Sequence, residues 1–374
     1  MAFSGVTRIL VLGGGGVFGS RLARILSADG RFELILAGRS LEKAGAVAAN
    51  LPKGAAVSCA QIDALHVEAG AIVALQPDLV VHCAGPFQGQ NTRVAEAAIK
   101  AGVPYADLSD GREFCAGFNR LDAAAKDAGV FALTALSTTT ALSTAAAMSL
   151  ATAFSTVSSV DVGVTPGNRA PRGKAVVEAI LSYVGEPIPQ VRGGAEVDVW
   201  GWGALRRIEI AGLGPRLFSP CDTPDPVAMG QLFPQADRIA FSAGLELSVL
   251  HLSLFVLARL RRWRLTPNLA GGVSFFHAVA DLFEPFGSDR GAMFVELAGQ
   301  SHDGAPLRRR WSLVAGGGDG PNIPVLGAAA LARKLASGER PAHGARMCIG
   351  EITLKDFEQE FAAFDIQTRT ETVS

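Results

Sequence analysis

Charged residues are scarce in this chain of 374 residues. Asp, Glu, Lys and Arg make up 18% of it and hydrophobic residues 49%, against roughly 25% charged residues in an average soluble domain. So little charge excludes a self-solvating disordered chain and predicts a compact protein with a large core. The length is about two and a half times that of a typical domain, which favours two domains.

The chain also lacks net charge. The 34 Lys and Arg residues balance 35 Asp and Glu residues, which leaves a net charge of −1. A neutral chain offers no overall field to a phosphate backbone, so the composition argues against a nucleic-acid partner and favours a small-molecule ligand. The five cysteines are scattered and odd in number, so neither a disulfide framework nor a zinc or other metal site is predicted.

Targeting signals and long hydrophobic runs are missing as well. The first residues lack the charged region, apolar run and cleavage site of a signal peptide, so we expect a cytoplasmic protein. The most hydrophobic segment, 245–260, has only 12 consecutive uncharged residues, Leu247 to Ala258. A bilayer span needs about 20, so no crossing is predicted.

The first 138 residues alternate short apolar runs with Ala- and Leu-rich stretches, a pattern typical of a doubly wound parallel sheet. The second part, 139–374, has longer strands separated by Gly- and Pro-rich segments. The fold class predicted is therefore α/β: an N-terminal Rossmann domain and a second α+β domain on a mainly antiparallel sheet, with helices on one side. This division leaves room for C-terminal helices to return and pack on the first domain. Prolines within 214–234 indicate an ordered loop or lid there.

The strongest local signal is a glycine loop between the first strand (8–12) and the first helix (19–28). It contains G-x-G-x-x-G at Gly14, Gly16 and Gly19. In this context Gly14 is expected to make a tight turn, Gly16 to admit a pyrophosphate and Gly19 to let helix and strand pack closely. The helix N-terminus would attract the phosphates. A tight turn that binds nothing is the alternative.

The end of the second strand (33–37) selects the cofactor. It leads into Gly38, Arg39 and Ser40, and no carboxylate is present to accept a hydrogen bond from a ribose 2′-hydroxyl. Arg39 can pair with a 2′-phosphate and Ser40 can donate to it, so NADP(H) is favoured over NAD(H); a solvated surface arginine is the alternative. After the third strand (56–61), Asp63 is expected either to accept from the adenine amino group or to cap the next helix.

Two further segments follow strands at the same sheet edge. The loop after the fourth strand (79–83) holds Ala84, Gly85, Pro86 and Phe87, which would present backbone to the nicotinamide ribose or form an ordinary turn. Then, over 105–113, come polar residues that include Asp107 and Asp110. These two carboxylates are our candidates for orienting or protonating a substrate, although a plain turn and a helix start explain residues 110–113 equally well.

Four of these motifs, in this order and spacing, resemble the saccharopine dehydrogenase-like oxidoreductases. They are GGGGVFG at 13–19, AGR at 37–39, CAGPF at 83–87 and YADLSD at 105–110. The resemblance covers roughly the first 140 residues and continues loosely through 171–173 and 318–321. It implies a Rossmann domain that binds NADP(H), a second domain over the nicotinamide, and hydride transfer at a carbon that bears nitrogen or oxygen.

Carried over by position, the resemblance assigns the pyrophosphate to the glycine loop, including Gly15, Val17 and Phe18. It assigns the 2′-phosphate to Arg39, the nicotinamide side to residues 84–87, and places Asp107 toward the reaction centre. One departure stands out: relatives have a glycine-rich turn after the last strand (130–134), where this chain has 135–140, ALSTTT. The substrate is not implied.

The segment 245–264 ends in the basic cluster RRWR, 261–264. Its apolar residues surround the predicted helix, which indicates either burial in the core or in a homodimer, or peripheral contact with a membrane. We therefore predict an NADP(H)-dependent oxidoreductase that acts on a small-molecule C=N, C=O or C=C bond between two domains. The alternatives are a non-catalytic NADP(H)-binding regulatory or scaffold protein, and a membrane-peripheral lipid reductase.

Overall fold

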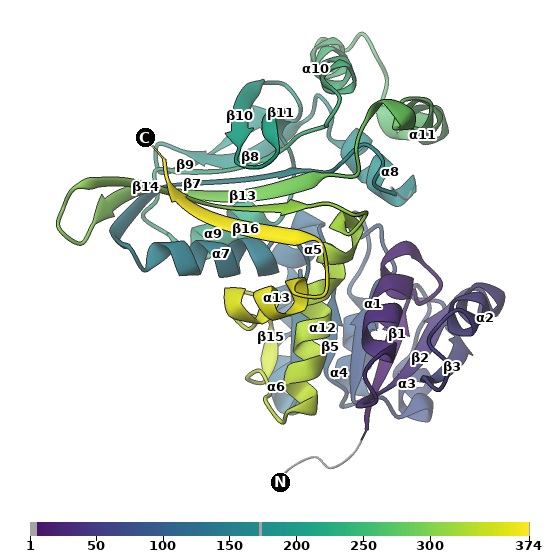
Figure 1. The fold of residues 1–374 in the computed structure, drawn as a ribbon. Helices are drawn as coiled ribbons and strands as arrows, with labels where there is room; N and C mark the ends of the chain where they lie inside the picture. The colour runs from purple at the N-terminus through teal and green to yellow at the C-terminus, as the bar shows by residue number, and fades with distance from the viewer. Residues whose placement is uncertain (1–5, 172–173, 374) are drawn as a thin grey trace. The chain divides into compact units, whose positions relative to one another are not determined.

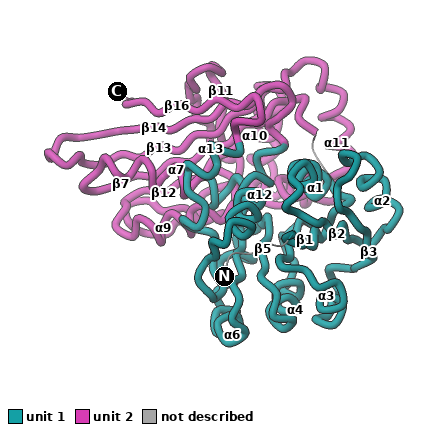
Figure 2. The backbone as a smooth tube through the Cα atoms, turned by 60° about the horizontal axis from the view of Figure 1, so that its bottom comes forward, with its two compact units in different colours: residues 1–142, 322–360 teal, residues 143–321, 361–374 magenta. Residues whose placement is uncertain are grey.

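The computed structural model describes residues 6–171 and 174–373. The chain divides into two compact units, coloured separately in Figure 2. Unit 1 contains Met1–Leu142 and Asn322–Glu360; unit 2 contains Ser143–Pro321 and Phe361–Ser374. The sequence-based boundary at residue 138 lies near the first division, and the later segment that returns to unit 1 contains a strand as well as helices.

Unit 1 is built on a parallel sheet whose strand order is β15-β6-β5-β4-β1-β2-β3 (Figure 1). Every pairing in it is parallel, and β3 to β6 follow the doubly wound order 3-2-1-4-5-6. This confirms the predicted Rossmann fold. The strands are β1 Thr7–Leu12, β2 Phe32–Gly38, β3 Ala56–Gln61, β4 Leu79–His82, β5 Tyr105–Asp107, β6 Phe131–Thr134 and β15 Gly344–Met347.

Helices connect these strands, as the alternation in the sequence predicts. Their core faces carry small and branched apolar residues, for example Leu22, Ala23 and Leu26 on the first of them. The third helix starts at Ala69, and before β6 a 3₁₀ turn is followed directly by a short helix. The helices are α1 Val17–Ser27, α2 Leu41–Ala49, α3 Ala69–Leu75, α4 Arg93–Lys100, α5 Arg112–Ala116, η1 Phe118–Leu121 and α6 Asp122–Asp127.

The returning segment completes unit 1. Helix α12, Ile323–Ala336, is rich in alanine and buried along most of its length, and it packs against α1. The small side chains allow the two helix axes to approach closely. Arg333 at its end is held by Asp29 and Glu360, both at 2.7 Å. Strand β15 then extends the sheet beside β6, and α13, Leu354–Phe361, follows it.

Unit 2 contains a second sheet with the order β10-β11-β12-β7-β13-β14-β16, and β8 and β9 pair beside β12. The pair β7 and β12 is parallel, and the remaining pairings are antiparallel. The sheet is therefore mixed and mostly antiparallel, as predicted. Its strands are β7 Phe154–Thr165, β8 Pro187–Arg192, β9 Ala195–Trp200, β10 Arg206–Ile210, β11 Gly214–Pro220, β12 Arg238–Ala243, β13 Gly291–Ser301, β14 Pro306–Ala315 and β16 Ile366–Thr372.

The prediction of a long loop or lid over 214–234 was wrong. This segment forms strand β11 and helix α9, Asp225–Leu232. The prolines are tolerated because of where they fall. Pro215 and Pro220 lie at the ends of β11, and Pro224 and Pro226 lie at the N-cap and first turn of α9, where no intrahelical backbone N–H is needed.

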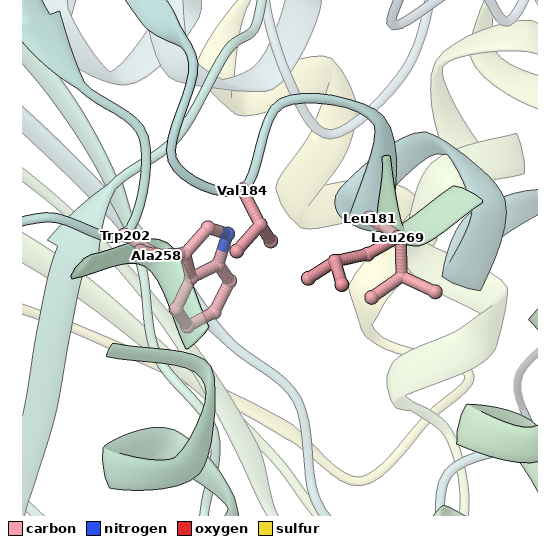
Figure 3. Close-up of a cluster of buried hydrophobic side chains, with 5 residues drawn as sticks. All are labelled: Leu181, Val184, Trp202, Ala258 and Leu269. Atoms are coloured by element: carbon pink, nitrogen blue, oxygen red, sulfur yellow. The ribbon is translucent and has the colours of Figure 1, made fainter. Parts of the chain in front are cut away.

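The helices of unit 2 are α7 Ala141–Ala151, α8 Lys174–Ser182, α9, α10 Ser248–Arg262 and α11 Val273–Leu282. Helices α8, α10 and α11 gather at one end of the unit (Figure 1). They share a core cluster of Leu181, Val184, Trp202, Ala258 and Leu269 (Figure 3). Among the described residues, no helix is long and apolar enough to cross a membrane.

Candidate functional site

The glycine loop lies where β1 and β4 end side by side in the sheet of unit 1. Gly13 has φ +86°, and a Cβ atom there would lie 2.9 Å from the backbone nitrogen of Ala84. The loop after β1 therefore touches the loop after β4 through backbone alone. In a doubly wound sheet this is the switch point at which ligands bind, since the connections on either side run to opposite faces.

Two glycines of the loop have positions that differ from those expected from the sequence. Gly13, which lies outside the motif, adopts the left-handed turn conformation that was expected of Gly14. A Cβ on Gly14 would lie 2.8 Å from Cβ of Leu36 in β2, and one on Gly15 would lie 2.9 Å from Cβ of Lys43 in α2. Both glycines therefore serve close packing of the loop against the neighbouring βα unit.

Gly19 packs closely against the strand as the fingerprint predicts, and the approach of a pyrophosphate to Gly16 stays a prediction. A Cβ on Gly19 would lie 2.2 Å from the carbonyl oxygen of Gly13, so only glycine permits this helix to begin so close to the strand. Gly16 is the N-cap of α1 and is exposed, and its only close neighbour would be the Gly13 oxygen at 3.1 Å. No side chain caps this helix. The backbone N–H groups of its first turn, at Val17 and Phe18, are thus left for an anion.

Arg39 follows β2 directly and its side chain is exposed. The described residues give it no ion pair, and Gln61 at the end of β3 fixes its backbone by donating to the Arg39 carbonyl at 3.1 Å. Ser40 is the N-cap of α2 and accepts a hydrogen bond from the backbone nitrogen of Lys43 at 3.2 Å. Its hydroxyl proton therefore remains to be donated elsewhere.

Asp63 caps a turn instead of the helix that follows. It accepts from the backbone nitrogen of Leu65 at 3.0 Å and pairs with His66 at 2.9 Å, whereas α3 begins later, with Glu68 as its N-cap. The hydrogen bond with His66, the backbone hydrogen bond and the nearby Arg39 together lower the pKa of Asp63. The capping role was therefore assigned to the wrong element; contact with adenine stays a prediction.

The loop after β4 is held from inside by Gln90. Its side-chain nitrogen donates to the carbonyl oxygens of Ala84, at 3.0 Å, and of Pro86, and the peptide bond between Gly85 and Pro86 is cis. Gly85 is exposed, so backbone is accessible here as expected. The ring of Phe87 is different: it is buried.

Phe87 packs edge-on against His82 at a centroid distance of 5.0 Å and against Phe114 at 5.4 Å. Its side chain therefore belongs to the core of unit 1. A role for Phe87 in binding the cofactor would be confined to its backbone.

Asp110 belongs to the loop after β5 and contacts the loop after β4. Its carboxylate accepts from the side-chain nitrogen of Gln88 at 3.2 Å, and burial raises its pKa. The neighbouring Gly111 lies against the backbone of Phe87, where an added Cβ would be 3.2 Å from the carbonyl carbon. The two loops are thus joined, with Asp110 at their junction.

Asp107 lies at the end of β5, and its carboxylate is fully buried. One carboxylate oxygen accepts from the backbone nitrogens of Ser109 and Ala135, both at 3.0 Å, and from the hydroxyl of Thr134 at 2.8 Å. The other accepts from the hydroxyl of Tyr105 at 3.0 Å. These four hydrogen bonds tie the carboxyl ends of β5 and β6 together.

This geometry corrects the expected orientation of Asp107, which faces the interior of unit 1. Burial raises its pKa to about 6, although all four hydrogen bonds act in the opposite direction. The Tyr105 hydroxyl also contacts Nδ1 of His82 at 3.1 Å. Because Tyr105 donates to the carboxylate, Nδ1 of His82 carries the proton that completes this chain. Burial lowers the pKa of His82 to about 4.

The segment after β6 departs from a glycine-rich turn in sequence but not in backbone conformation. Ala135 has φ +60° and Thr140 has φ +72°, values that glycine adopts most easily. Leu136 and Thr140 form an isolated antiparallel bridge between them. The chain thus makes a tight loop here without glycine, and Asp107 holds its first residue. Of the loosely similar motifs, Arg172 and Gly173 lie outside the described residues.

The parallel sheet, the glycine loop and the uncapped helix α1 define a Rossmann-type NAD(P)-binding domain. Residues 9–133 match the family model described as the saccharopine dehydrogenase NADP binding domain, which confirms the resemblance in sequence over this segment. No curated protein matches the chain.

One solved structure extends the similarity of fold to the rest of the chain. Apo histidine-tagged saccharopine dehydrogenase (L-Glu forming) from Saccharomyces cerevisiae aligns with a TM-score of 0.68 and 12% identity, over 98% of this chain and 100% of that one. An amine dehydrogenase from Mycobacterium smegmatis aligns with a TM-score of 0.44 and 12% identity, over 93% and 96%. The alignment with the yeast enzyme, at 12% identity, shows the fold alone and no reaction.

Proposed function

We propose that this protein is an NADP(H)-dependent oxidoreductase that transfers a hydride to or from a small-molecule C=N, C=O or C=C bond. The observation that carries the proposal is the pair formed by the N-terminus of α1, which no described side chain caps, and the exposed Arg39 after β2, to which the described residues give no ion pair. The first suits a pyrophosphate, and the second suits a phosphate on the adenosine ribose.

The residues around Arg39 support NADP(H) over NAD(H). An NAD-specific domain places a carboxylate at the end of β2, where this chain has Gly38, Arg39 and Ser40. Arg39 supplies a planar guanidinium group that is always charged, and Ser40 supplies a hydroxyl donor. Lys43, in the first turn of α2, supplies a second positive charge. Gln61 supports this arrangement by holding the Arg39 backbone in place.

Each part of the site then has a physical task. The first turn of α1 donates backbone N–H groups to the pyrophosphate, and Gly16 keeps the approach open. The backbone at Ala84 to Pro86 borders the nicotinamide side, fixed by Gln90. Bound NADP(H) would supply or accept the hydride, while the protein's residues position it.

A second candidate function is NADP(H) binding without turnover. The buried state of Asp107 favours it, because the carboxylate chosen as a catalytic acid is occupied by four donors within unit 1. Asp110, the other choice, is held by Gln88. On this alternative the domain senses or carries the dinucleotide, and the two carboxylates only shape the loops.

Calorimetric titration with NADPH and NADH tests the cofactor. We expect tight NADPH binding that Arg39→Ala weakens about 10- to 150-fold, the loss of a charged hydrogen bond of roughly 1.5 to 3 kcal/mol. NADH binding should change little. Arg24→Ala, an exposed arginine in the last turn of α1, is the matched control and should leave both affinities unchanged. Equal losses for the two cofactors would disprove the 2′-phosphate assignment.

Turnover distinguishes the two candidate functions. Purified protein with NADPH is screened against cyclic imines, ketones and enoyl thioesters by the decrease in NADPH absorbance. Consumption of NADPH that Gly16→Val abolishes supports the oxidoreductase, because a branched side chain at this open position blocks the pyrophosphate. Tight binding with no consumption across the panel favours the non-catalytic function.

A further inference from the structure

The helices α10 and α11 leave an apolar surface exposed. Of the 15 residues in α10, only His251 and Ala258 are buried, and α11 has no buried residue. Of the three alternatives for this segment, burial in the core of the chain is therefore the one that the structure contradicts. Exposed apolar area on this scale marks an interaction site in a folded protein.

The exposed residues fall on one face of each helix. Along α10 the side chains of Val249, Leu252, Val256 and Trp263 are 43–63% exposed, at spacings of three, four and seven residues. In the second helix and the turn after it, Phe275, Leu282 and Phe286 are 68–73% exposed, at spacings of seven and four. We call these seven residues the apolar face.

The opposite sides of the helices are firmly anchored, so the apolar face is part of a well-packed structure. Leu254, Leu257 and Phe276 pack on the buried cluster shown in Figure 3. His251 accepts from the backbone nitrogen of Leu245 at 3.2 Å through Nδ1 and donates from Nε2 to the hydroxyl of Ser219 at 2.9 Å. Both ring nitrogens are satisfied, which fixes the register of α10 against β11.

Unpaired positive charge lies beside the apolar face. Arg259, Arg262 and Arg264 are exposed, and the described residues give none of them an ion pair. Arg259 and Arg262 instead lie over the rings of Phe255 and Trp200, at 4.9 and 4.7 Å from the ring centroids. The neighbouring Arg261 differs, because Glu186 neutralises it.

Two acidic residues lie on or just after α11, and the described residues pair neither of them with Arg259, Arg262 or Arg264. On α11, Asp281 is engaged by His277 at 2.9 Å, and Glu284 follows the helix. Helices that carry a stripe of apolar side chains, an exposed tryptophan and uncompensated arginines match the interface of a bilayer with anionic headgroups, where rings enter the acyl boundary and cations meet phosphates.

We propose that the apolar face and its three arginines dock this protein on an anionic lipid surface. The sign of the charge selects this occupant over a second copy of the chain. A two-fold contact between parallel α10 helices would bring the arginines of both copies together, where like charges repel, and an antiparallel contact would leave the arginines at its two ends without a counter-charge from the partner α10. An anionic surface instead neutralises all three together. The proposal concerns unit 2 and does not depend on the cofactor assignment.

Sedimentation with vesicles tests the proposal. The full-length protein is mixed with phosphatidylcholine vesicles, with or without about one third phosphatidylserine, at low and high salt. We expect binding to the anionic vesicles that salt weakens. Each arginine near an anionic surface contributes roughly fivefold in affinity, equivalent to about 1 kcal/mol. The double variant Arg259→Gln/Arg264→Gln should therefore bind about 25-fold more weakly.

Variants of the apolar face distinguish specific docking on lipid from non-specific hydrophobic adsorption to vesicles. Leu252→Glu and Phe275→Ser change exposed side chains, so the fold should persist, and both should abolish sedimentation with vesicles. The matched controls are Val73→Ser, an exposed apolar residue on α3, and Arg207→Gln, an exposed arginine on β10, which should bind as the wild type does.

Two results would overturn the proposal. One is the absence of vesicle binding. The other is a dimer in light scattering that Leu252→Glu dissociates while vesicles leave the protein in solution, because the apolar face would then belong to a second copy. Thermal unfolding followed by circular dichroism, compared with the wild type, serves as the check that every variant is folded.

Discussion

Replacing Asp107 by Asn should change how stability depends on pH. Burial raises the pKa of the Asp107 carboxyl group to about 6 in the folded protein. The ordinary pKa of an aspartate, taken here for the unfolded chain, is 3.8. The protonated form is therefore the one that folding favours. Its stabilising effect is complete below pH 3.8 and is lost as the pH rises through about 6.

The magnitude follows from the shift. A difference of roughly two pKa units amounts to about 3 kcal/mol between the two limits, at 1.36 kcal/mol per unit. Between pH 8 and pH 5, about 1.4 kcal/mol of this should be recovered. Asn has the same shape: its oxygen can keep the three bonds from Ser109, Thr134 and Ala135, and its amide can donate to Tyr105. The variant should therefore fold, without the titration.

Urea denaturation of both proteins at several pH values between 5 and 8 measures the effect. The free energy of unfolding of the wild type, minus that of Asp107→Asn, should rise by about 1.4 kcal/mol as the pH falls from 8 to 5. Burial lowers the pKa of His82 and His251 to about 4, which destabilises both proteins in acid. That loss is common to the pair and cancels in the difference. A difference that stays flat, or falls in acid, would refute the reasoning.

The remaining predictions concern packing and are each measured by denaturation. Gly19→Ala should cost at least about 2 kcal/mol and abolish NADPH binding, because the added Cβ would lie 2.2 Å from the Gly13 oxygen. The control is Gly70→Ala in α3, where an added Cβ would have no atom within 4 Å, and this variant should be more stable than the wild type by about 0.5 to 1 kcal/mol. A larger loss of stability for Gly70→Ala than for Gly19→Ala would contradict the roles assigned to the two glycines. Leu181→Ala, in the cluster beneath α10, should cost about 2 to 5 kcal/mol, and the exposed Leu205→Ala less than about 0.5.

The sequence predicted the first unit well because its signals are local. Each strand of the parallel sheet is a short apolar run, and each helix follows it within a few residues, so the order of elements could be read directly from the chain. The glycine motif and Arg39 were found for the same reason. Residues 344–347 were not found, because a four-residue strand that pairs with β6 more than 200 positions away has no local signature.

The second unit was predicted less completely. Proline was taken as a sign of a loop over 214–234, yet proline at the end of a strand or in the first turn of a helix disturbs no hydrogen bond. For α10 the sequence left open burial in the core, a homodimer contact and a membrane contact. Apolar residues all around a helix indicate a hydrophobic environment on every side, but the pattern does not say whether the chain itself provides it.

The position of Asp107 shows why side-chain roles are harder to infer than folds. A short polar run after a strand suggested a catalytic group, but its direction depends on Thr134 and Ala135, which lie 27 and 28 residues further along the chain. That contact also explains the departure after β6. Ala135 adopts φ +60° without being glycine, and the Asp107 carboxylate accepts from its backbone nitrogen. The strained turn and the buried carboxylate therefore support each other, and neither can be understood from its own segment.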